Sequence, residues 1–161
     1  MDKIEDRDIK LSYLNRTYKI FIKGEKYKFK TSKCKMPFGI ERYNNKDIIN
    51  LEFDTNTNDG HNYIAMMKHC DKVFSKIQES GARMQKKFIE DIQDKYYITS
   101  LKERDLGKVH HRCHVKKGTN IDIILDEKYK ESDIYAEIEM ENIWISKDMF
   151  GIVWMITKID K

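Results

Sequence analysis

The chain has no glycine-rich loop of the kind that cradles phosphates; its seven glycines and single proline are scattered. It also lacks the metalloprotease spacing HExxH and the glycine-flanked serine of a nucleophile elbow. Acidic and histidine side chains are plentiful, yet none of them falls into a recognised catalytic spacing. The sequence therefore predicts a protein that is not an enzyme and that needs no cofactor.

Long apolar runs are missing as well. None approaches the roughly 20 residues that a membrane-spanning helix needs, and the first ten residues, MDKIEDRDIK, have no apolar core of the signal-peptide type. We therefore expect an intracellular protein with no membrane partner. The three cysteines are odd in number and far apart in the chain, which favours reduced thiols over a disulfide framework; they are Cys34, Cys70 and Cys113.

The chain is long enough, and contains enough hydrophobic residues, to form one domain. Its 161 residues are 40% hydrophobic and 36% charged, so a core can form. The net charge of +4 says little about partners, but the charges are segregated along the sequence. Arg16 to Lys35 contains eight basic residues and one acid, whereas Asp126 to Asp148 contains eight acids and three lysines. The first segment is a candidate for contact with a polyanion.

Two hairpins are expected early in the chain. Tyr18 to Ile22 and Lys26 to Lys30 alternate apolar or aromatic residues with basic ones around Gly24-Glu25, so one face of this hairpin should be basic. Ile40 to Tyr43 and Asp47 to Phe53 flank the turn signal Asn44-Asn45 and predict a second hairpin.

Helical periodicity follows. Apolar residues at spacings of three and four predict a helix from Tyr63 to Gln78, capped by Asp59 or Asn62, and a shorter helix over Arg83 to Gln93. The chain then returns to strands, and Trp144, Trp154, Phe53 and Phe74 are expected in the core because they sit in apolar patterns. The later strands are predicted at Tyr96 to Thr99, Val109 to Val115, Ile121 to Leu125, Ile134 to Ile145 and Ile152 to Ile159.

Strands, an internal helix or two, and then strands again exclude a parallel doubly wound sheet and favour an antiparallel barrel. The fold class predicted is mainly β within α+β: an OB-like antiparallel five-stranded barrel with one long inserted helix and a second candidate helix. The predicted domain covers residues 16–161, and the order of residues 1–15 is left open.

The segment HHRCH, from His110 to His114, contains ligand types that zinc prefers. In a strand, however, His110 and His114 share one face while His111 and Cys113 share the other, so the four cannot close around one ion without a bend. We expect no metal site here and interpret the segment as part of a basic strand.

Basic strands interleaved with Tyr and Phe suit single-stranded nucleic acid, because cations follow the phosphates and aromatic rings stack on the bases. The alternative for each lysine is a solvated face of an amphipathic strand. A second basic stretch runs from Lys102 to Lys117. The predicted phosphate contacts are Lys19, Lys26, Lys28, Lys30, Lys35, Arg42 and Arg112, and the predicted stacking residues are Phe21, Phe38 and Tyr43.

The segment MPFGIERY (36–43), followed by Ile48 to Phe53 and a helix, resembles the OB-fold single-stranded DNA-binding proteins of nucleocytoplasmic large DNA viruses. RCHVKK (112–117) and the ending from Ile143 to Trp154 carry the same resemblance, which covers about Cys34 to Ile159. That family is similar to the phage replication type. The resemblance implies a five-stranded barrel that coats single-stranded DNA during replication or recombination.

Phage-type proteins end in an acidic tail with a terminal aromatic residue, whereas this sequence ends Lys158-Ile159-Asp160-Lys161. The resemblance implies host cytoplasm at viral replication sites, or the virion, as the location. Single-stranded DNA is the expected partner; RNA, replication proteins and further copies of the chain stay open. Two rival functions remain: packaging of DNA or RNA as a structural protein, and a metal-dependent nuclease using some of the carboxylates Glu52, Asp54 and Asp59.

Overall fold

The computed structural model describes residues 3–80, 84–119 and 130–161. Within them, ten strands belong to one open, mixed sheet, accompanied by two α-helices. The chain divides into two compact units. The first combines Met1–Tyr27, Met66–Ser100 and Met140–Val153, and the second combines Lys28–Ala65, Leu101–Glu139 and Trp154–Lys161. No helix in the described part of the chain is long and apolar enough to cross a bilayer.

The first unit begins with an antiparallel hairpin, β1 (Ile9–Leu14) and β2 (Thr17–Ile22), which follows the short turn η1 (Asp6–Asp8). Asn15 and Arg16 connect the strands, and both have positive φ, 51° and 64°. This is the backbone of the two-residue turn that matches the twist of a hairpin. Residues 9–14 are therefore part of the sheet.

β2 also pairs with β9 (Tyr135–Ile145) through Tyr18 and Ile143, while β6 (Tyr96–Tyr97) runs parallel to β10 (Met149–Asp160). The short turn η2 (Ile77–Ser80) and helix α2 (Lys86–Asp91) complete this unit. Burial alternates along β2, as the sequence predicts. The largest side chains buried in this unit are Phe74, Phe88, Phe150, Ile20, Met67 and Ile77.

Helix α1 (Asn58–Ser75) runs through parts of both units. It confirms the helix predicted from Tyr63, but it begins five residues earlier because Thr57 caps it. The backbone N–H of Gly60 donates to Thr57 Oγ1 at 3.0 Å, the hydrogen bond that an N-cap residue makes. Neither Asp59 nor Asn62, the expected caps, holds that position.

The second unit is built around β5 (Lys46–Asp54), which lies between β4 (Ile40–Tyr43) and β8 (Lys108–Val115), antiparallel to both. β7 (Leu101–Glu103) pairs with β8 across the turn η3 (Asp105–Gly107). β8 runs parallel to β10, and β3 (Lys28–Lys30) pairs with β9. Phe53, Trp154, Leu51 and Ile49 are fully buried in this unit.

The second predicted hairpin is confirmed: β4 and β5 flank Asn44 and Asn45, which have φ of 50° and 61°. The first predicted hairpin is correct only at its turn. Lys23 and Gly24 have φ of 52° and 83°, and Ile22 and Glu25 form an isolated antiparallel bridge. Beyond this turn the two strands do not pair with each other: β2 pairs with β1 and β9, and β3 pairs with β9.

The predicted barrel is also wrong in its finer form. The sheet is open rather than a closed five-stranded barrel, and it contains parallel pairs. The mainly β, α+β character is confirmed. The strand predicted over Ile121 to Leu125 lies outside the described residues. Phe53, Phe74 and Trp154 are core residues as expected, while Trp144 is partly exposed.

Candidate nucleic-acid interface

One face of the β4–β5–β8 sheet in the second unit carries most of its polar side chains. Because cross-strand partners point to the same side, the register places Glu41 opposite Ile48, Tyr43 opposite Lys46 and Arg112 opposite Asn50. We call this side the Tyr43 face. Along it lie Glu41, Tyr43, Lys46, Ile48, Asn50, Glu52, Asp54, Lys108, His110, Arg112 and His114.

Two large aromatic side chains of this face are open to solvent. Tyr43 is 59% exposed and Phe38, in the loop before β4, is 51% exposed. The guanidinium of Arg112 lies over the Tyr43 ring, 4.8 Å from its centre. A planar cation stacked on an exposed ring is a surface on which a nucleic-acid base can also stack.

Beneath Phe38 the face contains a hydrogen bond between two largely buried side chains, His110 and Glu52. The Nε2 atom of His110 lies 2.8 Å from Glu52 Oε2, and the His110 ring makes an edge contact with Phe38 at 5.6 Å. His110 is only 5% exposed, and its Nδ1 atom has no hydrogen-bond partner among the described residues. Phe38 is thus positioned by packing on a ring that Glu52 holds in place.

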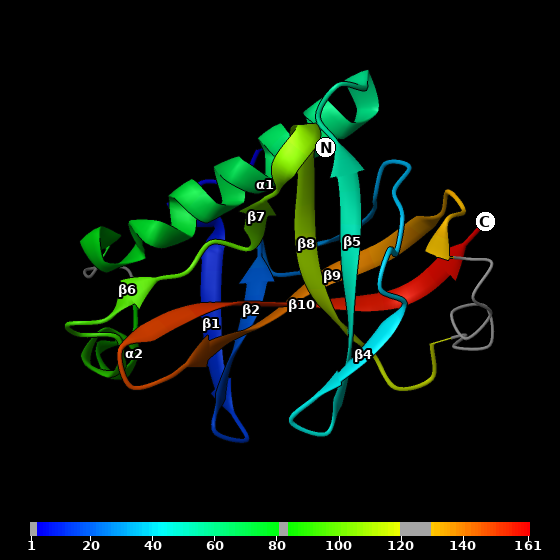
Figure 1. Ribbon diagram of the computed structural model, residues 1–161. Helices are drawn as coiled ribbons and strands as arrows, with labels where there is room; N and C mark the ends of the chain where they lie inside the picture. The colour runs from blue at the N-terminus through cyan, green and yellow to red at the C-terminus, as the bar shows by residue number, and fades with distance from the viewer. Residues whose placement is uncertain (1–2, 81–83, 120–129) are drawn as a thin grey trace. The chain divides into compact units, whose positions relative to one another are not determined.

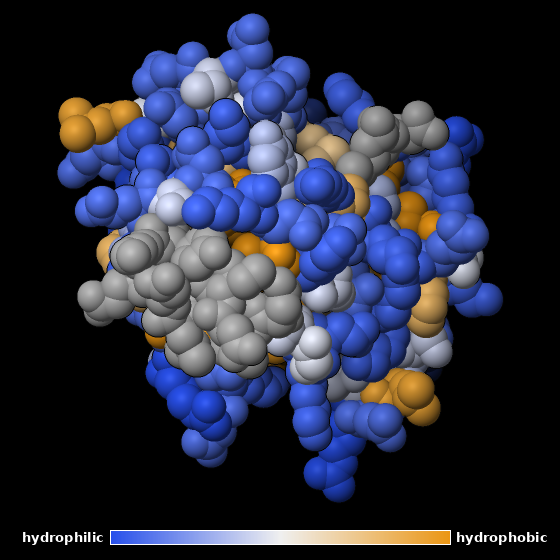
Figure 2. Space-filling model, turned by 90° about the vertical axis from the view of Figure 1, so that its right-hand side faces the viewer, coloured by the Kyte–Doolittle hydropathy of each residue, from blue (hydrophilic) through white to orange (hydrophobic). Residues whose placement is uncertain are grey.

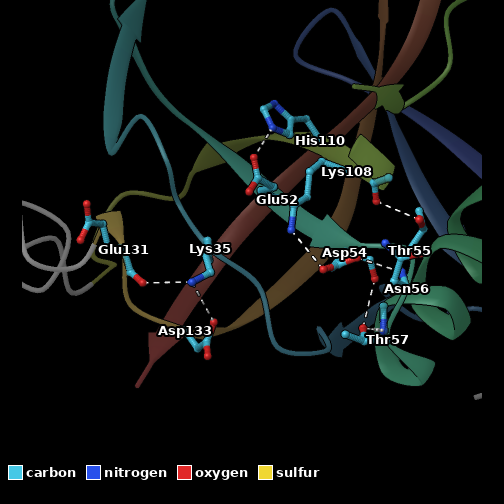
Figure 3. A network of polar contacts seen from close by, with 12 residues as sticks. Lys35, Glu52, Asp54, Thr55, Asn56, Thr57, Lys108, His110, Glu131 and Asp133 are labelled. Carbon is cyan, nitrogen blue, oxygen red and sulfur yellow. Dashed lines mark hydrogen bonds and ion pairs between the residues drawn. The ribbon is translucent and has the colours of Figure 1, made fainter. Parts of the chain in front are cut away.

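A cavity of about 340 Å³ adjoins the Glu52 end of this face. Figure 3 shows Lys35 and Lys108 facing carboxylates there: Lys35 Nζ lies 3.6 Å from Asp133, and Lys108 Nζ lies 3.1 Å from Asp54. The pKa of Asp54 is lowered, first by the N–H of Asn56 and then by Lys108. Two of the lysines that line the cavity are therefore already paired with carboxylates.

The carboxylates of the nuclease hypothesis, Glu52, Asp54 and Asp59, all line this cavity. Glu52 is engaged by His110 and Asp54 by Lys108. Among the described residues, no group of three or more His, Cys, Asp or Glu side chains is arranged to hold a metal ion.

Most of the predicted phosphate contacts are neutralised within the protein. The acidic segment that follows residue 126 supplies partners for the basic segment, because β2 and β3 both pair with β9. Glu141 binds both Lys19, at 2.9 Å, and Lys26, at 3.4 Å. The further pairs are Lys30 with Asp160, Lys35 with Asp133 and Arg42 with Asp47.

Of the predicted cations, Lys28 and Arg112 have no ion pair within the described part of the chain. Lys28 is exposed and lines a second cavity of about 530 Å³ that also contains Lys30 and Lys116. Lys46, which the sequence analysis did not single out, is likewise exposed and without an ion pair in that part. Its place on the Tyr43 face follows only from the register of the hairpin.

Phe21 belongs to the first unit and is not one of the residues that define the Tyr43 face. It is partly exposed, and the ammonium of Lys26 lies 5.2 Å from the centre of its ring. Lys10 stands opposite Phe21 in the β1–β2 hairpin. The first unit therefore has a smaller basic and aromatic surface of its own.

The histidine and cysteine segment forms strand β8, and the expected alternation is confirmed. His110 and His114 share the Tyr43 face, whereas His111 and Cys113 point into the core of the second unit. Burial lowers the pKa of His111 to about 3, and the Tyr63 hydroxyl lies 2.7 Å from His111 Nδ1. The pKa of His114 is lowered by burial and by the nearby cations Lys46 and Arg112.

Comparison with known proteins adds no assignment. No family model, curated protein or solved structure matches this chain. In Figure 2 hydrophilic side chains cover most of the visible face, and hydrophobic ones appear in small separate groups.

Proposed function

We propose that this protein binds single-stranded nucleic acid, with DNA as the expected ligand, and that the Tyr43 face is the binding surface. The observation that carries the proposal is the exposed ring of Tyr43 with the Arg112 guanidinium stacked on it, next to the second exposed ring, Phe38. Stacking platforms flanked by cations are what sequence-tolerant binding of single strands requires.

The arrangement of this face favours a single strand over a duplex. Bases of a single strand are free to stack on protein rings, whereas those of a duplex are occupied by one another. The cations that lack an ion pair in the described chain and lie on this face, Arg112 and Lys46, stand close to Tyr43, so phosphate contacts and stacking can occur together.

The resemblance to viral single-stranded DNA-binding proteins supports the same proposal and adds a role: coating and protecting single strands during viral replication or recombination, inside an infected cell. On this proposal the protein performs no chemistry. Its binding depends on salt, because phosphate contacts release counterions.

The test compares fluorescence anisotropy of labelled oligo-dT, a matched RNA and a matched duplex over a salt series. We expect oligo-dT to bind more tightly than the duplex at moderate salt. Equal affinity for duplex would instead support the packaging function, and absence of binding to all three ligands would overturn the proposal.

The stacking residues provide the matched variants. Phe38→Ala with Tyr43→Ala should weaken oligo-dT binding by about 1–3 kcal/mol for each base that loses its platform. Tyr96→Ala is the control, because Tyr96 is 60% exposed but lies in the first unit. Unchanged oligo-dT affinity in the double variant would move the binding site away from the Tyr43 face.

A further inference from the structure

The turn between β7 and β8 presents a leucine to solvent. Glu103 pairs with Val109, and the Arg104 N–H donates to the Lys108 carbonyl at 2.8 Å, which closes a hairpin around residues 105–107. Leu106 stands at the tip and is 90% exposed, more than any other large hydrophobic side chain of the described chain.

Leu106 is also held in an unfavourable backbone conformation. Its φ of 60° and ψ of 35° lie in the left-handed region, which a branched, bulky residue rarely adopts. Such strain persists only where the surroundings impose it, and it concentrates at functional positions. A glycine or asparagine would suit this backbone better, so an exposed leucine here calls for a role of its side chain.

The surroundings that impose the strain are visible in the second unit. Thr55 follows β5 and donates two hydrogen bonds to the Gly107 carbonyl, from its N–H at 2.9 Å and from Oγ1 at 2.8 Å. Gly107 itself has φ of 71°, and a Cβ there would lie 2.9 Å from Thr55 Oγ1. Figure 3 shows Thr55 next to the Asp54–Lys108 pair. The tip is therefore anchored to the end of β5.

This anchoring places the leucine tip beside one end of the Tyr43 face. Lys108, two residues after Leu106, bonds to Asp54, the last residue of β5 on that face. Lys102 and Arg104 are exposed on the chain just before the tip, together with the acids Glu103 and Asp105. Proteins that bend DNA insert apolar side chains, leucine among them, between base steps and use Lys and Arg beside them.

We propose that Leu106 packs on the terminal base pair where a single strand on the Tyr43 face continues into a duplex, so that the preferred ligand is a junction between single-stranded and double-stranded DNA. This inference rests on the proposed function: the Tyr43 face holds the single strand, and the tip recognises the place where that strand becomes paired.

The test measures anisotropy with oligo-dT alone, with the same single strand extending from a duplex in either polarity, and with a blunt duplex. We expect one junction polarity to bind several-fold more tightly than oligo-dT. Leu106→Ala and Leu106→Gly should abolish that gain and leave oligo-dT affinity unchanged. Leu14→Ala is the matched control, since Leu14 is 57% exposed at the end of β1 in the first unit.

The two proposals fail in different ways. Oligo-dT affinity reports the proposed function alone, and its absence overturns both proposals. If oligo-dT binds but neither junction binds more tightly, or if the gain survives in Leu106→Ala, the junction proposal is wrong while the proposed function stands. Leu106→Gly suits the left-handed backbone and should melt no lower than the native chain, so a loss of the gain in this variant cannot be attributed to unfolding.

Discussion

The guanidinium carbon of Arg112 lies 4.8 Å from the centre of the Tyr43 ring, although the two residues belong to strands separated by β5. The contact joins the end of the β4–β5 hairpin to the middle of β8. Arg112 has no carboxylate partner in the described chain, whereas Lys19, Lys26 and Arg42 each form an ion pair. Arg112 is therefore a cation that remains available for a phosphate.

Replacing Arg112 should change the salt dependence of binding. In Arg112→Gln the plot of log affinity for oligo-dT against log salt concentration should become shallower by about 0.7, the value of one phosphate contact on a single strand. Lys19→Gln should leave the slope unchanged, because Glu141 already holds that lysine. The same loss of slope in both variants would contradict the distinction between paired and available cations.

The buried His111 should make the protein less stable in mild acid. Burial lowers its pKa to about 3, whereas an ordinary histidine has a pKa of 6.5. Between these values the unfolded chain binds a proton that the folded chain excludes, so the free energy of unfolding falls as the pH falls, by up to about 1.4 kcal/mol per pH unit. Above pH 6.5 His111 contributes no pH dependence.

Urea unfolding at a series of pH values from about 4 to 8, which spans the ordinary histidine pKa, measures how the free energy of unfolding depends on pH. His111→Leu places an apolar side chain in the core and should flatten the profile below pH 6.5, at some cost in stability because the contact between the Tyr63 hydroxyl and His111 Nδ1 is lost. The exposed His61 supplies the control, His61→Gln, which should retain the slope. An unchanged slope in His111→Leu would assign the acid sensitivity to other groups.

The first strand should contribute to stability. Leu11 is 3% exposed, so Leu11→Ala should lower the free energy of unfolding by about 2–5 kcal/mol, the usual cost of truncating a buried leucine. Ser12→Ala, on the exposed side of the same strand, should change it by no more than about 0.5 kcal/mol. A small effect of Leu11→Ala in urea unfolding would show that β1 is dispensable for the fold.

The three cysteines should be protected from alkylation in the folded protein. All three are free and buried, and burial raises the pKa of Cys34 and of Cys70 to about 12 and raises that of Cys113 as well. Since the thiolate is the reactive form, iodoacetamide at neutral pH should label the chain only after urea is added. Ser12→Cys, which places a thiol on the surface, is the positive control; rapid labelling of the folded native chain would contradict the burial of its thiols.

Local patterns predicted several elements correctly. The spacing of Ile64, Met67 and Phe74 predicted α1, and the turn Asn44-Asn45 predicted the β4–β5 hairpin. The alternation of His110 to His114 was correct in β8. These features depend on neighbours within a few residues, so the periodicity of side chains and the conformation of a turn are sufficient to predict them.

The candidate site was predicted only in part. Phe38, Tyr43 and Arg112 were predicted as nucleic-acid contacts, which stays a prediction; the structure leaves the Phe38 and Tyr43 rings exposed and brings Arg112 onto the same face. Most of the lysines named with them are in ion pairs with acids more than ninety positions away in sequence, as Lys19 is with Glu141. Lys46 was not recognised, because it owes its place on the face to the register of a hairpin rather than to a basic pattern.

The sequence by itself therefore determined the helix, the Asn44-Asn45 turn and the alternation of faces, because each of these arises from contacts between residues close in the chain. Only the tertiary structure decided which strands are neighbours. That choice also decided which basic side chains are paired with acids and which are not. Once β2 and β3 pair with β9, the basic segment lies against the acidic one, and a single sequence contains no local signal for that choice of partner.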